Sequence, residues 1–453
     1  MLLAEQYSGE QRRNAIVGGG FAGVATAWHL LAHASSPVSV HLFDGAGIAG
    51  GASGAAAGLL HPYSPKGKVL WNGLEAMNAA LELLQVATAF QDRAHPELEP
   101  ISWAQSFLRP AANAKQAQDF SRTQSMIETS QQAHRQLAGS TDGARMCVDS
   151  SSNSNGSAES SSREAVSVRA LSLEEAAQRV PGLPSEQLNA ALGPELAASA
   201  ALLIEGGHVI HPTRYLRALW GACEELAMQR GVTADLHTTN VSSIAQLQHE
   251  HGPFCGTVVA AGAAAGILPE IGDKLPCDLC QGYTLDMAPN SDSASATEHL
   301  TLGSAEKSTA GLSLLGSTYL ATQGPENIVV GATKRHQLTP HEALAECGRQ
   351  VSDSSERASA TSALMPRAEK AWPSIASWRV AGVRTGVRAL PPRDQHGSLP
   401  LAGRVAGEQN VWVVGGLGAR GLVYHAWLGS LMARAVLGDN EAVLPKQLRR
   451  WQA

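Results

Sequence analysis

The sequence predicts an α/β fold in which a Rossmann-like domain is interleaved with a second domain built on an antiparallel β-sheet. Three observations support this prediction. A short apolar strand runs into the turn GGGFAG near the N-terminus, a second strand ends on an acidic residue, and residues 274–378 carry mostly strand-like segments. Strands that alternate with helices favour a parallel sheet, whereas successive strands favour an antiparallel one.

The glycine turn close to the N-terminus is the organising element. Residues 15–17 indicate the end of a buried strand, and Gly18, Gly20 and Gly23 follow with the spacing G-x-G-x-x-G before a helix predicted over residues 21–34. Glycine permits the tight turn, the close approach of a pyrophosphate and the packing of helix against strand. The first amide groups of the helix then point at the anion. The expected contacts are Gly18, Gly20, Phe21, Ala22 and Gly23.

An acidic residue after the next strand specifies the ligand further. Residues 38–43 alternate as a strand does, and Asp44 follows them, 21 positions after Gly23. A carboxylate at this distance can accept a hydrogen bond from a ribose hydroxyl. Strand, turn, helix, strand and acid in this order predict an adenine dinucleotide site; the alternative is that Asp44 is only a solvated strand end.

Composition limits the class of protein. The 453 residues, 44% hydrophobic and 16% charged, suit a soluble globular protein of two domains. The net charge of −6 gives no general electrostatic footprint for nucleic acid. No stretch of ~20 apolar residues predicts a membrane span, and the first strand starts too early for a signal peptide to precede it. The protein is expected to be intracellular, in the cytosol or an organelle, without a membrane partner.

Cysteine usage agrees with this compartment. Six cysteines without a dense framework suit a reducing environment. Cys277 and Cys280 form one C-x-x-C pair, but no second pair at matching spacing completes the four ligands of a structural zinc site. The sequence therefore predicts no metal.

The segments after Asp44 continue both domains. Residues 45–67 are rich in glycine and are expected to lie against the ligand. Residues 149–162 contain eight serines and are expected to be a disordered surface insertion. Ser172 and Glu175 have the spacing of a capping box at the start of a short helix. The contacts expected in the glycine-rich segment are Gly51, Ala52, Ser53, Gly58 and Leu59.

Two later strand-and-turn units return to the first domain. Residues 257–266 predict a buried strand and a glycine turn containing Ala261 and Gly262. Residues 411–422 (VWVVGGLGARGL) repeat the glycine spacing before a helix predicted over 423–437. No ribose acid follows, so this helix start is expected to stabilise negative charge on a reduced flavin ring rather than to bind a second dinucleotide. Its expected contacts are Gly416, Gly418, Ala419, Arg420, Gly421 and Leu422.

The order of these motifs carries a family resemblance. The chain contains, in sequence, GGGFAG, Asp44, GGASGAAAGLLHP, GGHVIHP, VVAAGA, VVGAT, GVRALPPRDQHGSLPLAG and GGLGARGL. It resembles the D-amino-acid oxidase and glycine oxidase superfamily of FAD-dependent amine oxidoreductases. Within that superfamily it is most similar to the FAD-dependent oxidoreductase domain of the tRNA-uridine modification protein MnmC.

The resemblance implies a domain order. An FAD-binding domain would be formed by residues 12–94, 206–273 and 386–453. An antiparallel substrate domain would be formed by residues 95–205, which include the insertion 149–162, and by residues 274–385. The FAD is expected to be bound non-covalently, because no cysteine lies where the resemblance would place a covalent attachment.

The resemblance also implies the substrate residues. Arg388, in GVRALPPRD, stands where the family places the arginine that pairs with a substrate carboxylate, and planar guanidinium grips a carboxylate at two points. Arg384 and Arg420 are second choices, and each has the alternative of a structural ion pair. Tyr283 is expected to line the pocket, with a core or interface tyrosine as the alternative. The implied reaction oxidises the C–N bond of a small carboxylated amine or amino acid, with O₂ as acceptor.

Three other functions stay open at this point. The first is a tRNA wobble-uridine oxidoreductase that acts on a carboxymethylaminomethyl group by the same chemistry. The second is a nicotinamide-dependent dehydrogenase, which would not require the second glycine turn. The third is a non-catalytic flavoprotein that serves as an assembly factor.

Overall fold

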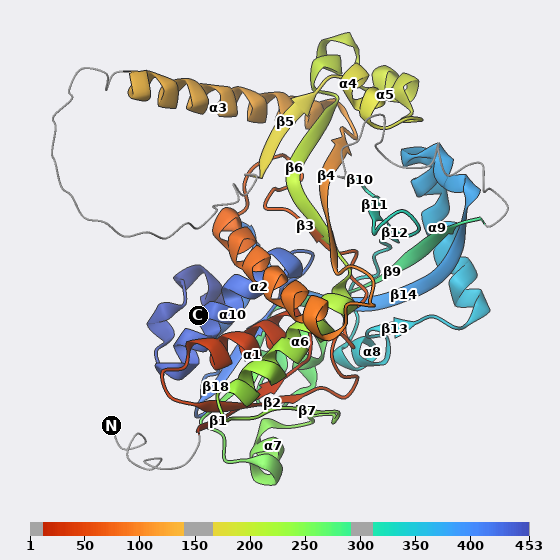
Figure 1. Ribbon diagram of the computed structural model, residues 1–453. Helices are drawn as coiled ribbons and strands as arrows, with labels where there is room; N and C mark the ends of the chain where they lie inside the picture. Colours follow the sequence, from red (N-terminus) through yellow and green to blue (C-terminus); the bar gives the residue numbers. More distant parts are fainter. Residues whose placement is uncertain (1–11, 140–165, 291–310, 453) are drawn as a thin grey trace.

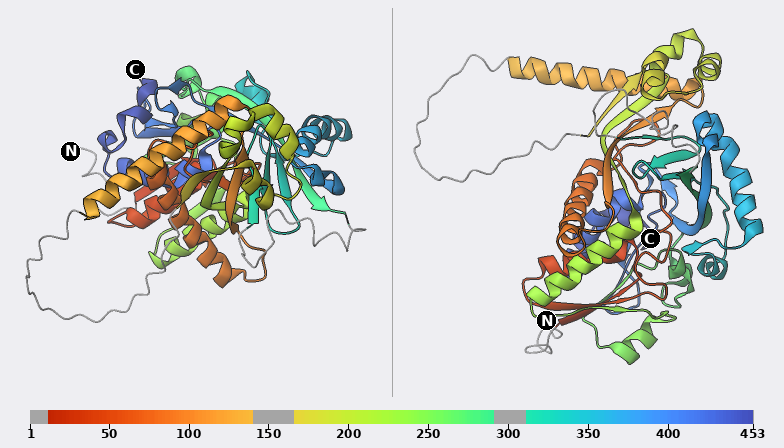
Figure 2. Two further views of the ribbon diagram at one scale, coloured as in Figure 1. Left: turned by 90° about the horizontal axis from the view of Figure 1, so that it is seen from above. Right: turned by 45° about the vertical axis from the view of Figure 1, so that its right-hand side comes forward.

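The computed structural model describes residues 12–139, 166–290 and 311–452 (Figure 1). Two β-sheets dominate this part of the chain, and helices cover both of them (Figure 2). No helix in the described ranges has the length and apolar character that crossing a membrane requires. The serine-rich residues 149–162 lie outside the described residues.

The first sheet has six strands among the described residues, in the order β17-β18-β8-β1-β2-β7. All its neighbours are parallel except the edge pair β17 and β18. Strands β2, β8 and β18 and the last four residues of β1 are buried, as apolar strands covered on both faces should be. The strands are β1 Arg12–Val17, β2 Val38–Phe43, β7 Ala234–His237, β8 Gly256–Val259, β17 Leu401–Arg404 and β18 Val411–Gly415.

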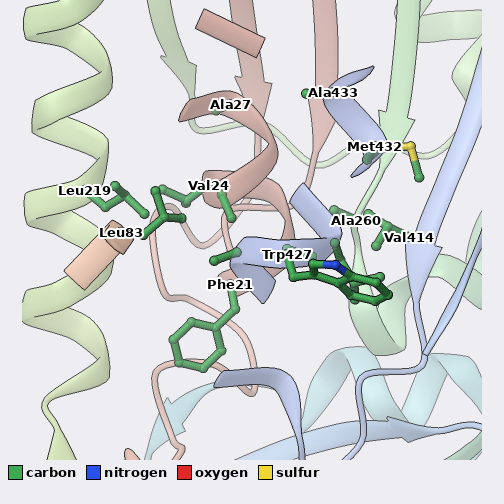
Figure 3. Close-up of a cluster of buried hydrophobic side chains, with 14 of the residues drawn as sticks. Phe21, Val24, Ala27, Leu83, Leu219, Ala260, Val414, Trp427, Met432 and Ala433 are labelled. Carbon is green, nitrogen blue, oxygen red and sulfur yellow. The ribbon is translucent and has the colours of Figure 1, made fainter. Parts of the chain in front are cut away.

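Four helices pack together on one face of this sheet (Figure 1). They are α1 Phe21–His33, α2 Gly73–Ala94, α6 Pro212–Gln229 and α10 Gly421–Leu437. Figure 3 shows side chains from all four helices meeting in one core, among them Val24, Leu83, Leu219 and Trp427. The opposite face is covered by α7 Ile244–His251 and the short helical turn at residues 262–267.

The second sheet has ten strands among the described residues, with β5 paired to β6 beside the main order β13-β14-β9-β12-β11-β10-β4-β6-β3. One pair departs from the expected antiparallel order, because β10 runs parallel to β4. The strands are β3 Leu59–Leu60, β4 Ser102–Pro110, β5 Ser167–Leu171, β6 Ala201–Ile210, β9 Asp278–Pro289, β10 Gly311–Leu314, β11 Tyr319–Thr322, β12 Ile328–Gly331, β13 Arg349–Gln350 and β14 Trp378–Leu390.

The helices of the second unit surround its sheet. They are α3 Ala114–Gly139, α4 Leu173–Arg179, α5 Ser185–Leu192, α8 Pro340–Ala345 and α9 Ser354–Ala371, and α3 extends well beyond the sheet (Figure 1). The capping box predicted from Ser172 and Glu175 is present at the start of α4. A small hairpin, β15 Arg393–Asp394 with β16 Gly397–Ser398, follows β14.

Two long strands carry the chain from the second sheet to the first. Strand β6 ends one residue before His211, the cap of α6, and β14 ends at Leu390, shortly before β17. Both strands run across boundaries expected from the sequence, at residues 205/206 and 385/386. The end of β14 therefore lies where the two units meet.

Candidate active site

A cavity lies between the two units. Its walls come from the glycine turn before α1, the segment after Asp44, the turn after β8, the turn before α10, and the facing strands β9, β11 and β14. The structure thus brings together segments that are far apart in the chain. The residues predicted from the sequence that line this cavity are Gly18, Gly20, Phe21, Ala22, Asp44, Gly51, Ala52, Ser53, Gly58, Leu59, Ala261, Gly262, Arg388, Gly416, Gly418, Ala419, Gly421 and Leu422.

The turn before α1 is built as the sequence predicts. Gly18 has a φ of +115°, and a Cβ there would lie 2.5 Å from the Ala260 carbonyl oxygen of the neighbouring strand turn. Gly23 lies outside the lining, and its role is packing, because a Cβ on it would lie 1.8 Å from the Gly18 carbonyl oxygen. The N-cap of α1 is Gly20, which has no side chain to cap the helix. Amides of the first turn are therefore left for an anion.

Ser53 connects the glycine-rich segment to this helix start. Its Oγ accepts a hydrogen bond from the Phe21 amide at 3.0 Å. One of the first amides of α1 is thereby satisfied by protein, while the serine itself lines the cavity. The segment after Asp44 is thus fixed against the dinucleotide turn.

Asp44 shapes the loop as well as facing the cavity. Its Oδ2 accepts from the Gly19 amide at 2.7 Å, and its Oδ1 accepts from the Ala46 amide at 2.8 Å. A carboxylate oxygen has two lone pairs, so each still has capacity to accept from a ribose hydroxyl. The carboxylate, the glycine backbone and the open helix start together fit the adenine half of FAD.

The turn before α10 differs from the expectation in one respect. Gly416 and Gly418 have φ of +61° and +55°, values that favour glycine. The Gly418 amide, however, donates to the Ala389 carbonyl at 3.1 Å, so it holds the end of β14. Arg420 lies outside the cavity lining and interacts with Tyr424; burial lowers its pKa.

Arg388 is the cation of the cavity on the side of the second sheet. It lies on β14 opposite Cys280 of β9, and a Cβ on Gly282 would be 3.4 Å from its Nη2. Within the described residues no carboxylate oxygen lies within 4.0 Å of its guanidinium nitrogens, and its Nη2 faces the Cys280 sulfur at 3.9 Å. Arg384 contrasts with it, since Arg384 is bound by Asp286 at 2.5 and 2.9 Å. Arg384 therefore forms the structural ion pair that was the alternative for this residue.

A short polar chain continues behind Arg388. The Cys280 sulfur lies 3.7 Å from His336 Nε2, and His336 Nδ1 lies 2.6 Å from Asp278 Oδ2. The hydrogen bond from His336 lowers the pKa of Asp278. If Asp278 accepts a hydrogen bond from His336 Nδ1–H, then Nε2 can accept one from the Cys280 thiol, and the sulfur can accept one from Arg388. Every group in this chain then has a partner.

Tyr283 does not line the cavity. Its hydroxyl donates to Glu356 Oε1 at 2.6 Å and accepts from Gln281 Nε2 at 3.0 Å. In the pairing of β9 with β14, Tyr283 stands opposite Thr385, whereas Arg388 stands opposite Cys280. Successive side chains of a strand point to opposite faces, so Tyr283 and Arg388 belong to different faces.

Tyr319 is the tyrosine that the structure places in the cavity, and the sequence did not single it out. It lies on β11 and shares the lining with Arg388, Thr284 and Gly282. Burial raises the pKa of Tyr319 to about 12, and Arg388 and Arg384 partly offset this effect. Its hydroxyl therefore stays protonated at neutral pH and can donate to an anion beside Arg388. The only sequence signal was its place within residues 274–378, which are mostly strand-like.

The comparisons with known proteins give a family match and solved structures that share the fold. A family model described as DAO, FAD dependent oxidoreductase, matches residues 13–435. No curated protein matches the chain.

Solved structures share the fold at low sequence identity. Glycine oxidase from Geobacillus kaustophilus has a TM-score of 0.66 and 17% identity, covering 97% of this chain and 98% of its own. Iminodiacetate oxidase from Chelativorans sp. BNC1 has a TM-score of 0.60 and 18% identity, covering 96% of this chain and 98% of its own. L-proline dehydrogenase from P. horikoshii has a TM-score of 0.62 and 13% identity, with 98% of both chains covered.

Proposed function

Because the chain belongs to the DAO family of FAD-dependent oxidoreductases, we propose that it oxidises the C–N bond of a small carboxylated amine or amino acid, with O₂ as the electron acceptor. The observation that carries this proposal is Arg388, a cation in the cavity with no carboxylate partner among the described residues. A partly buried guanidinium without a counter-ion is costly unless an anion joins it. A substrate carboxylate is such an anion.

The residues of the chain divide into two groups in this proposal. The turn before α1, Asp44 and the segment containing Ser53 would hold the FAD. Arg388 and Tyr319 would hold the substrate carboxylate and so orient the C–N bond. When bound, the flavin supplies the acceptor for the hydride. With an amine that binds neutral, the protein mainly positions the two reactants, and this accounts for catalysis without a dedicated acid–base pair.

The experiment that tests this function follows the colour of the purified protein. We expect yellow protein that releases FAD on denaturation and is bleached anaerobically by a carboxylated amine. Glycine, iminodiacetate, proline and a tRNA carrying a carboxymethylaminomethyl uridine form an informative panel, with the decarboxylated amines as controls. Colourless protein that binds NADH would contradict the proposal. Yellow protein that no amine bleaches would favour an assembly factor.

A tRNA substrate would be distinguished from a small amine by the salt dependence of its binding. Its carboxymethyl group presents the same anion to Arg388, but its affinity would come largely from phosphate contacts and would fall steeply with salt. Turnover of tRNA that is salt-sensitive, without oxidation of small amines, would favour this function.

Tyr319 and Tyr283 form a matched pair for a test of the substrate site. Tyr319→Phe should raise the Michaelis constant of a carboxylated amine by an amount equivalent to about 1.5–3 kcal/mol, the contribution of a hydrogen bond to a charged group. Tyr283→Phe should leave it nearly unchanged, because the Tyr283 hydroxyl binds Glu356 outside the cavity. Steady-state kinetics on both variants would measure the difference. A larger effect for Tyr283→Phe would reverse the assignment.

A further inference from the structure

Three possible metal ligands meet at the outer edge of the first sheet, outside the cavity. His41 on β2 stands directly opposite Asp235 on the edge strand β7, and His237 follows two residues later. Residues two apart on a strand share a face, so both β7 side chains lie on the side of His41. None of the three lines the cavity between the two units. His41 is buried, and the other two are partly exposed.

Two of the three distances between their ligand atoms match those of a tetrahedral coordination shell. His41 Nδ1 lies 3.2 Å from Asp235 Oδ2 and 3.3 Å from His237 Nε2, and all three ligand atoms lie within 4.8 Å of one another. Metal–ligand bonds of about 2.0–2.1 Å in a tetrahedron put neighbouring ligand atoms about 3.3 Å apart. We propose that His41, Asp235 and His237 form a binding site for a transition-metal dication of the zinc type.

The donor set selects this class of cation. Two imidazole nitrogens and one carboxylate oxygen suit Zn²⁺, Co²⁺ or Ni²⁺, whereas Ca²⁺ and Mg²⁺ prefer oxygen ligands throughout. Three protein ligands leave a fourth position for water. His251 of α7 packs beside His237, with ring centroids 5.6 Å apart. The prediction of no metal considered only the Cys277 and Cys280 pair.

Arg13 lies on the other side of the His41 ring and affects its protonation. Its Nε donates to His41 Nε2 at 3.1 Å, so in the metal-free protein the ring proton of His41 is on Nδ1. When the cation binds Nδ1, the ring proton moves to Nε2, and the Nε2–H then needs a hydrogen-bond acceptor. Arg13 must release the ring, and its guanidinium already lies over Phe254, 5.1 Å from the ring centroid. The arginine therefore weakens the site without abolishing it.

The site adjoins the nucleotide loop. The ring of His237 stacks on Phe43, with centroids 4.4 Å apart. The backbone carbonyl oxygen of His237 accepts a hydrogen bond from the Asp44 amide at 3.1 Å. Coordination of His237 would fasten the edge strand β7 to β2 immediately before Asp44. The cation has a structural role in this arrangement, and it is independent of the oxidation proposed above.

Zinc titration of the full-length protein, purified with its cofactor and stripped with a chelator, tests the site. Isothermal calorimetry with Zn²⁺ alone should give one site per chain, and Zn²⁺ should raise the unfolding temperature. His237→Phe keeps the ring stacked on Phe43 but removes the ligand nitrogen. Its affinity should fall by more than about tenfold, since outer-shell changes alone cost 10- to 100-fold. His249→Ala, on the exposed side of α7, is the control and should bind as the wild type does.

A second pair of variants separates coordination from general destabilisation. Arg13→Gln offers an acceptor to His41 Nε2–H and should tighten zinc binding about tenfold, the size of an outer-shell effect. Asp235→Asn should weaken zinc binding. This variant takes the place of His237→Phe if His237→Phe does not fold. No zinc binding by the wild type, or equal affinity in the wild type and the ligand variants, would overturn the proposal. Unchanged or weaker affinity in Arg13→Gln would overturn the assignment of His41 Nδ1.

Discussion

Arg388→Ala is expected to raise the Michaelis constant for a carboxylated amine by an amount equivalent to roughly 3–5 kcal/mol while FAD stays bound. The loss is large because the variant leaves the substrate carboxylate in the cavity without its cation. FAD should be retained, because the groups assigned to the dinucleotide lie on other segments. Steady-state kinetics and the flavin absorbance of the same preparation measure both effects.

Two further variants make this prediction specific. Arg388→Lys should recover only part of the loss, since an ammonium cannot make the parallel two-point contact. Arg379→Ala, at an exposed position of the same strand β14, should behave as the wild type. If Arg388→Ala oxidises its substrate as well as the wild type does, Arg388 is not the anchor. Arg384 is a poor replacement for it because Asp286 already binds that guanidinium.

Asp44→Ala is expected to weaken FAD binding by roughly 1–3 kcal/mol, the cost of leaving hydrogen-bonding groups unpaired. The structure adds a second cause, because the carboxylate also accepts from the amides of Gly19 and Ala46 and so holds the loop. Fluorescence titration of the cofactor-free protein with FAD measures the change.

Asp44→Asn separates the two causes. An amide keeps one acceptor oxygen for the loop but loses the charge, so its affinity should lie between those of the wild type and Asp44→Ala. Asp92→Ala, an exposed acid on α2, is the matched control. Unchanged FAD affinity in Asp44→Ala would mean that Asp44 is a solvated strand end.

The backbone of the proposed dinucleotide half was predictable because its geometry is local. Gly18, Gly23 and Asp44 belong to one strand, turn, helix and strand, in which neighbours along the chain are neighbours in space. Backbone sterics alone select glycine where a Cβ on Gly23 would meet the Gly18 carbonyl oxygen at 1.8 Å. Such constraints act residue by residue, so the sequence displays them directly.

The substrate half was less predictable because it depends on the register between distant strands. Tyr283 and Arg388 were expected in one pocket, but the pairing of β9 with β14 sets them on opposite faces. Tyr319 enters the cavity from β11, which joins the sheet only through its partners β12 and β10. Motifs in a single chain do not fix a register between strands a hundred residues apart. The parallel pairing of β10 with β4 was hidden for the same reason.

The hydrogen bond from the Gly418 amide to the Ala389 carbonyl joins the turn before α10 to the residue next to Arg388. The φ of Gly418 is +55°, a value that glycine adopts without strain and that side chains disfavour, so glycine suits this position. A displacement of this turn would therefore be passed to the backbone beside Arg388, the proposed substrate residue. We therefore expect FAD and the carboxylated substrate to influence each other's binding. Such coupling is reciprocal, so each ligand would change the affinity for the other by the same factor.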